Sequence, residues 1–178
     1  MRFEELTRSA QLDTLCNLHD LLNDGLFNGS LKRAAHVPPI EELGDNDVYT
    51  LPIDTIRIAI AHAGKSINYC ARAHFEGHNV LYDEAIVFDY FDIKYNIATY
   101  NDKQQQINEL AAIMLHEMIH QYIYEEGIKD NSPHGRAFKR ECKKHGLIRT
   151  PYLNDDCQWV HEEELSAEAQ DVIKGFCF

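Results

Sequence analysis

The sequence has no long hydrophobic run. No stretch approaches the roughly 18 consecutive apolar residues that a membrane-spanning helix needs, so we expect no contact with a membrane. Residues 1–11 carry an acidic pair and lack the apolar segment of a secretory signal. These two absences predict a cytoplasmic protein.

The sequence also has few cysteines, and no two of them form a CxxC pair. The five are scattered along the chain, and an odd number is left over in any pairing. This pattern argues against a disulfide framework and against a cysteine zinc ribbon. A reducing compartment such as the cytosol fits best.

Basic residues are outnumbered by acidic ones, which gives the chain a formal net charge of -12. An acidic surface repels phosphate backbones, so any contact with nucleic acid must come from a local basic patch. The length of 178 residues and the ordinary share of hydrophobic residues, 44%, predict one globular domain over residues 1–178.

Patterns along the chain predict an α+β fold with helices at both ends and a small, mostly antiparallel sheet between them. Leucines at three- and four-residue steps predict a first helix over 12–26, which "NGS" at 28–30 ends. Two segments rich in β-branched and aromatic residues, "SINYCARAHFE" and "EAIVFDYFDI", predict a hairpin. Residues 56–64 fit both strand and helix. The segment "LIRTPYLNDDCQW" is expected to be irregular, and "SAEAQDVIKGF" a short final helix capped by Ser166.

The strongest helical pattern covers about residues 102–126 and contains the stretch "HEMIH". Asn101 or Asp102 can cap this helix. Apolar side chains gather on one face, whereas His116, Glu117 and His120 lie on the other, which we expect to face solvent.

Two imidazoles at positions i and i+4 of one helix face can bind a single Zn²⁺, and the intervening glutamate reaches a water molecule rather than the metal. His134 begins the next helical segment, "HGRAFKRECKKHG", after a short loop, so it can supply a third ligand. Three protein ligands leave a fourth position open, as in catalytic zinc sites. His145 and His161 are rival third ligands, although His145 groups with apolar residues and His161 lies within a run of glutamates.

These motifs together resemble the SprT-like (Spartan-type) zinc metalloprotease domains, in which an HExxH helix is followed by a histidine in an HGxxF-type motif. The segments "LFNGSL" at 26–31 and "EAIVFDYF" at 84–91 also fit that family's order of elements. The resemblance covers residues 8–146 and leaves 147–178 as a C-terminal extension. It implies a zincin-like fold with the sheet packed on the HExxH helix. It also implies zinc binding by His116, His120 and His134, with Glu117 as catalytic base.

The resemblance further implies metal-assisted peptide hydrolysis. A further hydrogen-bond donor should stabilise the oxyanion of the transition state, and Tyr152, Arg136 and His161 are candidates. An edge of the sheet offers a place where an extended substrate can add as a strand. We therefore expect a zinc endopeptidase acting on a protein or peptide substrate.

The substrate is left open by the sequence. SprT-like proteases are associated with proteins crosslinked to DNA, and the segment after His134 presents one basic stripe, a feature that suits weak DNA binding but also an ordinary solvated helix face. The alternatives are a DNA-independent peptidase acting on a specific regulator and a non-proteolytic, zinc-ordered binding domain. The stripe consists of Arg136, Lys139, Arg140, Lys143 and Lys144.

Overall fold

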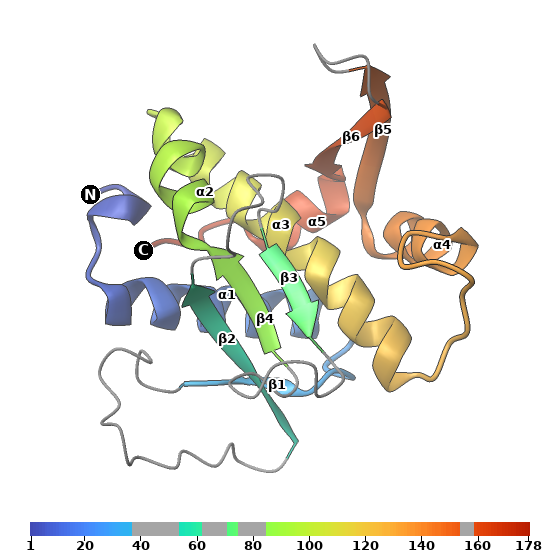
Figure 1. Cartoon of the computed structure of the whole chain (residues 1–178). Coiled ribbons are helices and arrows are strands. Elements are labelled where there is room, and N and C mark those ends of the chain that lie inside the picture. The colour runs from blue at the N-terminus through green and yellow to red at the C-terminus, as the bar shows by residue number, and fades with distance from the viewer. Residues whose placement is uncertain (37–53, 62–70, 75–84, 154–158) are drawn as a thin grey trace.

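The computed structural model describes residues 1–36, 54–61, 71–74, 85–153 and 159–178 (Figure 1). Within them the chain is a mixed α+β protein with two small sheets. The helices are η1 (Phe3–Glu5), α1 (Arg8–Leu26), α2 (Tyr90–Tyr95), η3 (Ile97–Thr99), α3 (Lys103–Glu125), α4 (Arg136–His145) and α5 (Ala167–Val172). The strands are β1 (Arg33–Ala35), β2 (Thr55–Ala61), β3 (Ala71–His74), β4 (Ala85–Asp89), β5 (Leu147–Leu153) and β6 (Trp159–Leu165).

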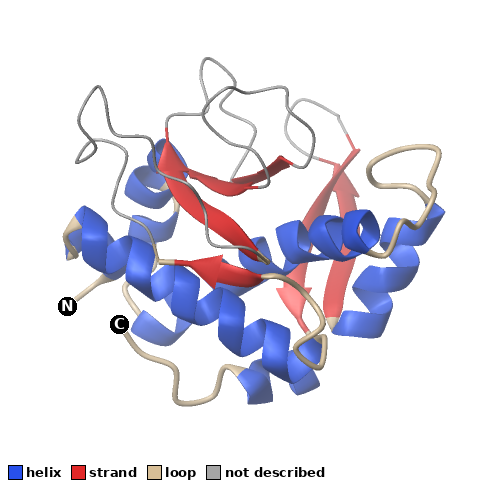
Figure 2. Ribbon diagram, turned by 90° about the horizontal axis from the view of Figure 1, so that it is seen from below, coloured by secondary structure: helices blue, strands red, loops and turns tan. Residues whose placement is uncertain are grey.

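The predicted first helix is confirmed as α1. The Thr7 hydroxyl accepts a hydrogen bond from the amide of Ala10 and so satisfies one of the free donors at the helix start. Asn28 and Gly29 both have positive φ, 55° and 68°, and the left-handed backbone there ends the helix where "NGS" stands. The apolar face of α1 packs against α3 and the sheet (Figure 2).

The four-stranded sheet has the order β1-β2-β4-β3. The predicted hairpin is confirmed in part, since β3 and β4 are antiparallel neighbours, but residues 90–93 of its second segment belong to helix α2, and 66–70 and 75–84 lie outside the described residues. The prediction of a mostly antiparallel sheet is wrong for this sheet, because β1 pairs with β2, and β2 with β4, in parallel. Of the undecided segment 56–64, residues 56–61 belong to β2, and 62–64 lie outside the described residues.

Burial on both faces explains the parallel pairs, because parallel sheets occur where each face is covered. Ile56, Ile58 and Ile60 of β2 point into the main core with α1 and α3. Ala59 of the same strand joins Ala85 and Val87 of β4 in a second, smaller cluster on the opposite face. A short apolar strand of this kind carries no local signal of its pairing direction.

The predicted long helix is confirmed as α3, and the Asp102 carboxylate caps it by accepting a hydrogen bond from the amide of Gln104 at 3.0 Å. The helix lies between the four-stranded sheet on one side and α4 with the β5–β6 hairpin on the other (Figures 1 and 2). As a result, the second face of α3 does not simply face solvent as expected. Ile113 and Glu117 on that face are only 8% and 6% exposed.

Of the segment 147–159, predicted to be irregular, residues 147–153 form strand β5, Trp159 begins β6, and 154–158 lie outside the described residues. β5 pairs with β6 in antiparallel register from Leu147 opposite Leu165 to Leu153 opposite Trp159. Pro151, which weakens the strand pattern in the sequence, is tolerated because, within the described part of the chain, β5 pairs with β6 alone and has no partner on its other edge. This hairpin packs on α3 and α4 through its base.

The two helices near the C-terminus begin and end close to the predicted residues. Gly146 stops α4 in the left-handed conformation, with φ of 83°, and the amide of Ser166 donates a hydrogen bond to its carbonyl oxygen at 2.8 Å. The Ser166 hydroxyl in turn caps α5. Gly146 thereby joins the end of α4 to the end of the hairpin. Among the described residues, no helix combines the length and the apolar character needed to cross a bilayer.

Candidate metal centre

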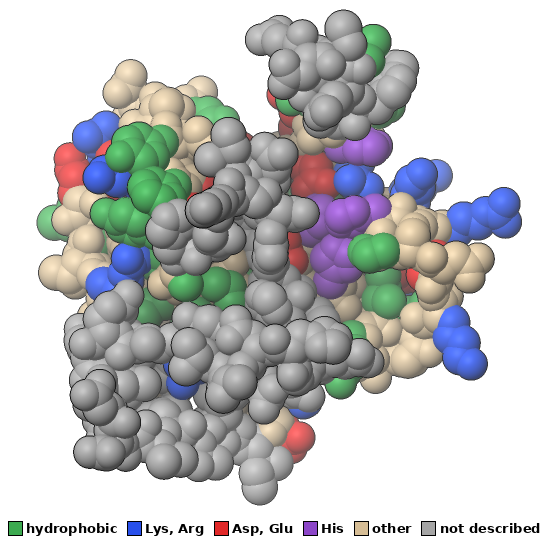
Figure 3. Space-filling view, viewed as in Figure 1, with side chains coloured by type: hydrophobic (Ala, Val, Ile, Leu, Met, Phe, Trp, Pro, Cys, Tyr) green, Lys and Arg blue, Asp and Glu red, His purple; other side chains and the backbone are tan. Residues whose placement is uncertain are grey.

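Three histidine rings converge at the junction of α3 and α4. His116 and His120 lie one turn apart on α3, with their Nε2 atoms 3.3 Å from each other. His134, in the loop before α4, places its Nε2 atom 3.1 Å from that of His116 and 3.2 Å from that of His120. In Figure 3, histidine side chains form a group that is open on this face beside the basic side chains.

The triangle of nitrogens has the size that a tetrahedral zinc site requires. Ligand nitrogens at roughly 2.0–2.1 Å from Zn²⁺ are about 3.3–3.4 Å apart in a regular tetrahedron. The observed separations, 3.1–3.3 Å, are close to that value. The three histidines also form a group of residues able to hold a metal ion. The three ring nitrogens therefore have the chemistry and the spacing of three zinc ligands.

His120 and His134 are the two histidines of the site whose pKa values are shifted most, and both are in the neutral form that binds a metal. Burial, reinforced by the charges of His116 and His134, lowers the pKa of His120 to about 3. The ring of His134 is covered in part although the residue is exposed, and this partial desolvation and the neighbouring His116 lower its pKa to about 4. Both rings are therefore neutral at pH 7, and metal ligation requires neutral imidazole.

The loop that carries His134 is fixed by Asp130. Its carboxylate accepts hydrogen bonds from the amides of Ala137 at 2.7 Å and Phe138 at 3.2 Å, so it satisfies donors in the first turn of α4. Gly135 lies so close that a Cβ atom at this position would collide with the Asp130 carboxylate. This explains the glycine that follows His134 in "HGRAF".

Phe138 forms the floor of the site. Its ring is fully buried, and its centroid lies 4.9 Å from that of His116, 4.4 Å from that of His120 and 4.8 Å from that of His134. The guanidinium of Arg149 on β5 lies 5.1 Å from the same centroid, on the hairpin side. The aromatic residue of the motif thus packs against all three rings at once.

A carboxylate that the sequence interpretation missed contacts the first histidine. Both oxygens of Glu163 on β6 lie near Nδ1 of His116, at 2.9 and 2.8 Å. Burial opposes ionisation of Glu163, but the hydrogen bond from His116 and the charge of Arg149 hold its pKa below the usual range. The alternation of β6 gives the only signal in the sequence, because it places Glu163 on the same face as the buried Leu165.

The rival third ligands lie elsewhere. His145 is buried against Phe27, with ring centroids 4.1 Å apart, and its Nδ1 donates to the carbonyl oxygen of Leu26 at 2.9 Å. It serves the core, as the apolar pattern of α4 predicted. His161 is exposed on β6 and is not part of the group of three.

The three candidate oxyanion donors differ in their placement. The hairpin register pairs His161 with Pro151, two positions beyond the pair of Arg149 and Glu163 and on the same face. Tyr152 belongs to the alternate set of residues, which points to the other face of the hairpin. Arg136 is an exposed residue at the start of α4.

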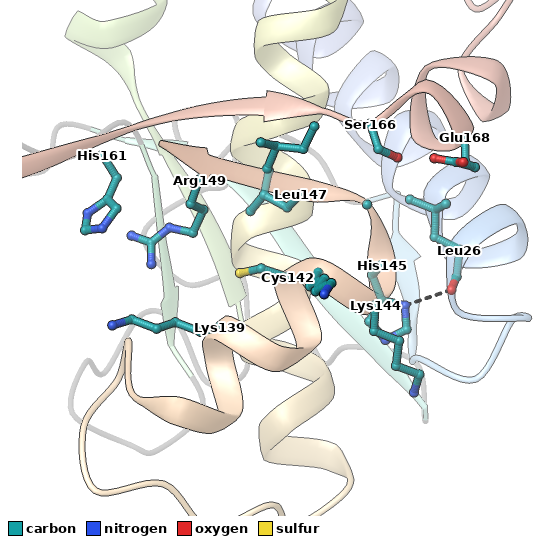
Figure 4. A pocket seen from close by; sticks show the side chains of 13 residues that line it. Leu26, Lys139, Cys142, Lys144, His145, Leu147, Arg149, His161, Ser166 and Glu168 are labelled. Carbon is teal, nitrogen blue, oxygen red and sulfur yellow. Dashed lines mark hydrogen bonds between the residues drawn. The ribbon is translucent and has the colours of Figure 1, made fainter. Parts of the chain in front are cut away.

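The five basic residues of α4 also differ in their surroundings. Lys139, Lys143 and Lys144 line a groove of about 650 Å³ between α4 and β5 (Figure 4). Arg149 and His161 lie at the end of that groove where Lys139 is found. Arg140 instead forms an ion pair with the buried Glu141 at 2.7 Å.

The mixed α+β fold and the group of three histidines define a protein with a candidate metal centre on its HExxH helix. A family model described as the SprT-like family matches residues 56–157, which is more than half of the chain. The chain therefore belongs to the SprT-like family, as its motifs suggested. No curated protein and no solved structure matches it.

Proposed function

We propose that this protein is a zinc-dependent endopeptidase of the SprT-like type, with His116, His120 and His134 as the metal ligands. The observation that supports this most is the triangle of Nε2 atoms, with edges of 3.1–3.3 Å, beside a glutamate on the same helix. Membership of a metalloprotease-type family points in the same direction.

In this proposal, each residue of the site has one task. Zinc, when bound, supplies a Lewis acid that polarises the scissile carbonyl and lowers the pKa of water toward about 7. The Glu117 carboxylate accepts a proton from the attacking water and returns it to the leaving amine. His161 is the best placed of the three candidate oxyanion donors, since it shares the hairpin face of Glu163.

An extended substrate would pair with the edge of the four-stranded sheet. Among the described strands, β3 is the last in the order of the sheet, and it lies beside α3 (Figure 1). Main-chain hydrogen bonds to such an edge hold a peptide without regard to most of its side chains. This mode suits an endopeptidase with a loosely folded protein substrate.

The proposed activity is tested with purified protein, a loosely folded protein substrate and a zinc chelator. We expect about one zinc per chain, cleavage of the substrate, loss of cleavage with the chelator and recovery when zinc is added back. Stoichiometric zinc without any cleavage, with and without single-stranded DNA, would instead favour a zinc-ordered binding domain.

We also propose that the groove between α4 and β5 binds nucleic acid weakly and without sequence preference. Lys139 and Lys143 support this, because neither forms an ion pair with another described residue and both line the groove. Surface acids elsewhere oppose binding little, because their repulsion is screened beyond about 8 Å at physiological salt. Bound DNA would lie near His134 and could bring a crosslinked protein to the metal.

Charge reversal in the groove tests this second proposal. The double variant Lys139→Glu/Lys143→Glu should bind single-stranded DNA more weakly, and its log–log salt slope should flatten by about 0.7 for each phosphate that the variant no longer neutralises. Zinc content should not change. The slope is measured by titration with labelled DNA at several salt concentrations.

The matched control is Lys94→Glu/Lys174→Glu, which changes the net charge equally on α2 and after α5. It should keep the wild-type slope, since the proposal rests on local rather than total charge. If wild-type protein shows no DNA binding at low salt, the basic residues of α4 are only a solvated face. A DNA-independent peptidase with a specific protein substrate is then the better account.

A further inference from the structure

Both ring nitrogens of His116 have close neighbours. Its Nε2 atom belongs to the triangle with His120 and His134, and its Nδ1 atom lies 2.8 Å from the nearer oxygen of Glu163. Glu163 is a carboxylate, which can only accept a hydrogen bond, so the proton of a neutral His116 ring lies on Nδ1. Nε2 then presents a lone pair to the centre of the triangle.

Glu163 is itself held in place. Arg149 stands opposite it in the register of the β5–β6 hairpin and donates from Nε to a Glu163 oxygen at 2.6 Å. The side chains of Arg149 and Glu163 are only 12% and 20% exposed. The Arg149 guanidinium also rests over the ring of Phe138. Ion pairs that are partly buried and fixed by packing are more rigid than exposed pairs.

Glu163 does not belong to the ligand set itself. The group of residues whose donor atoms converge consists of the three histidines alone among the described residues. Its carboxylate contacts the nitrogen of His116 that faces away from this group. Glu163 can therefore act on a metal only through His116.

The residue also lies outside the part of the chain that the family model matches. That match ends at residue 157, whereas β6 covers Trp159–Leu165. The C-terminal hairpin strand thus brings a charged group of its own to a site whose histidines and Glu117 all lie within the matched segment.

We propose that Glu163, held by Arg149, is a positioning residue that fixes the tautomer and the ring orientation of His116 for metal binding. This inference rests on the proposed zinc site. A carboxylate that accepts the second N–H of a ligand histidine makes the ring a better donor and prevents it from rotating. The hairpin β5–β6 is then part of the metal centre rather than an appendage to it.

The test compares the zinc affinity of Glu163→Gln with that of wild-type protein, by competition with a chromophoric chelator. Removal of such a partner weakens metal binding by about 10- to 100-fold, and we expect a decrease in this range. Glutamine has nearly the same shape, so the metal-free variant should fold. Circular dichroism and urea unfolding of the metal-free proteins check this directly.

Glu164→Gln is the matched control, because Glu164 is exposed and lies on the other face of the same strand. It should keep wild-type affinity. A second readout is the visible absorption of Co²⁺ bound in place of zinc, which reports ligand geometry. The spectrum should change in Glu163→Gln and in Arg149→Met but not in Glu164→Gln, because Arg149 acts through Glu163.

Equal zinc affinities and equal cobalt spectra for wild type and Glu163→Gln would overturn this inference. The ion pair of Arg149 and Glu163 would then only stabilise the hairpin. That result would leave the proposed peptidase intact. If wild-type protein itself takes up no zinc, both the proposed function and this inference fail. Zinc uptake by the wild-type protein therefore distinguishes the failure of this inference alone from the failure of both.

Discussion

Replacement of Glu117 by glutamine is expected to abolish peptide cleavage while the fold and the zinc content stay unchanged. Glutamine is nearly isosteric with glutamate, so it fits a position that is only 6% exposed. Its amide cannot accept the proton of the attacking water. General-base catalysis contributes about 10²- to 10⁴-fold to a rate, so the decrease should be at least of that size.

The measurement is the rate of substrate cleavage at saturating zinc, with metal content determined on the same samples. Glu126→Gln serves as a control, because Glu126 is an exposed residue at the end of the same helix. It should cleave at the wild-type rate. Retained turnover in a Glu117→Gln preparation free of wild-type enzyme would remove Glu117 as the base, and with it the proposed mechanism.

The parts of the fold that the sequence predicts best are those with local signals. α3 has a capping aspartate, a long apolar face and a glycine after its end, and each of these acts within a few residues. α4 has a glycine that stops it in the left-handed conformation. The placement of His116 and His120 one turn apart follows from α3 alone, so it could be predicted without any tertiary information.

The parts that the sequence does not predict depend on contacts between distant residues. The pairing of β2 with β4 joins strands separated by β3, and no local pattern specifies it. The hydrogen bond between His116 and Glu163 spans 47 residues. The burial of Ile113 on the second face of α3 likewise depends on tertiary packing and not on the helix itself. Periodicity indicates which face of a helix is apolar, but it does not show what covers the other face.

The third histidine lies between these two cases. His134 could be predicted as a candidate because it follows α3 after a short loop, but the sequence left His145 and His161 as rivals. What brings His134 to the other two rings is the cap formed by Asp130 and the close approach of Gly135. Both interactions lie within one loop, but an aspartate that caps the next helix and a glycine beside it are too common in sequences to identify this loop in advance.

Replacement of His134 by alanine should release most of the zinc, because it removes one of three converging ring nitrogens. The decrease in affinity should exceed the roughly 10- to 100-fold expected when only an outer partner of a ligand is removed. His134 is exposed and precedes α4, so the fold should survive. Zinc is measured in the purified variant after dialysis, and urea unfolding of the metal-free protein checks its stability.

His161→Ala is the sharper control for this prediction, since His161 is also an exposed histidine near the groove. It should keep full zinc, and any decrease in activity should then reflect its proposed role as oxyanion donor. His145→Ala should lower the stability because it removes the ring that packs against Phe27, and it should not release the metal from folded protein. If His134→Ala keeps full zinc while either of the other variants loses it, His134 is not the third ligand, and the catalytic geometry proposed above must be rebuilt around the histidine that is.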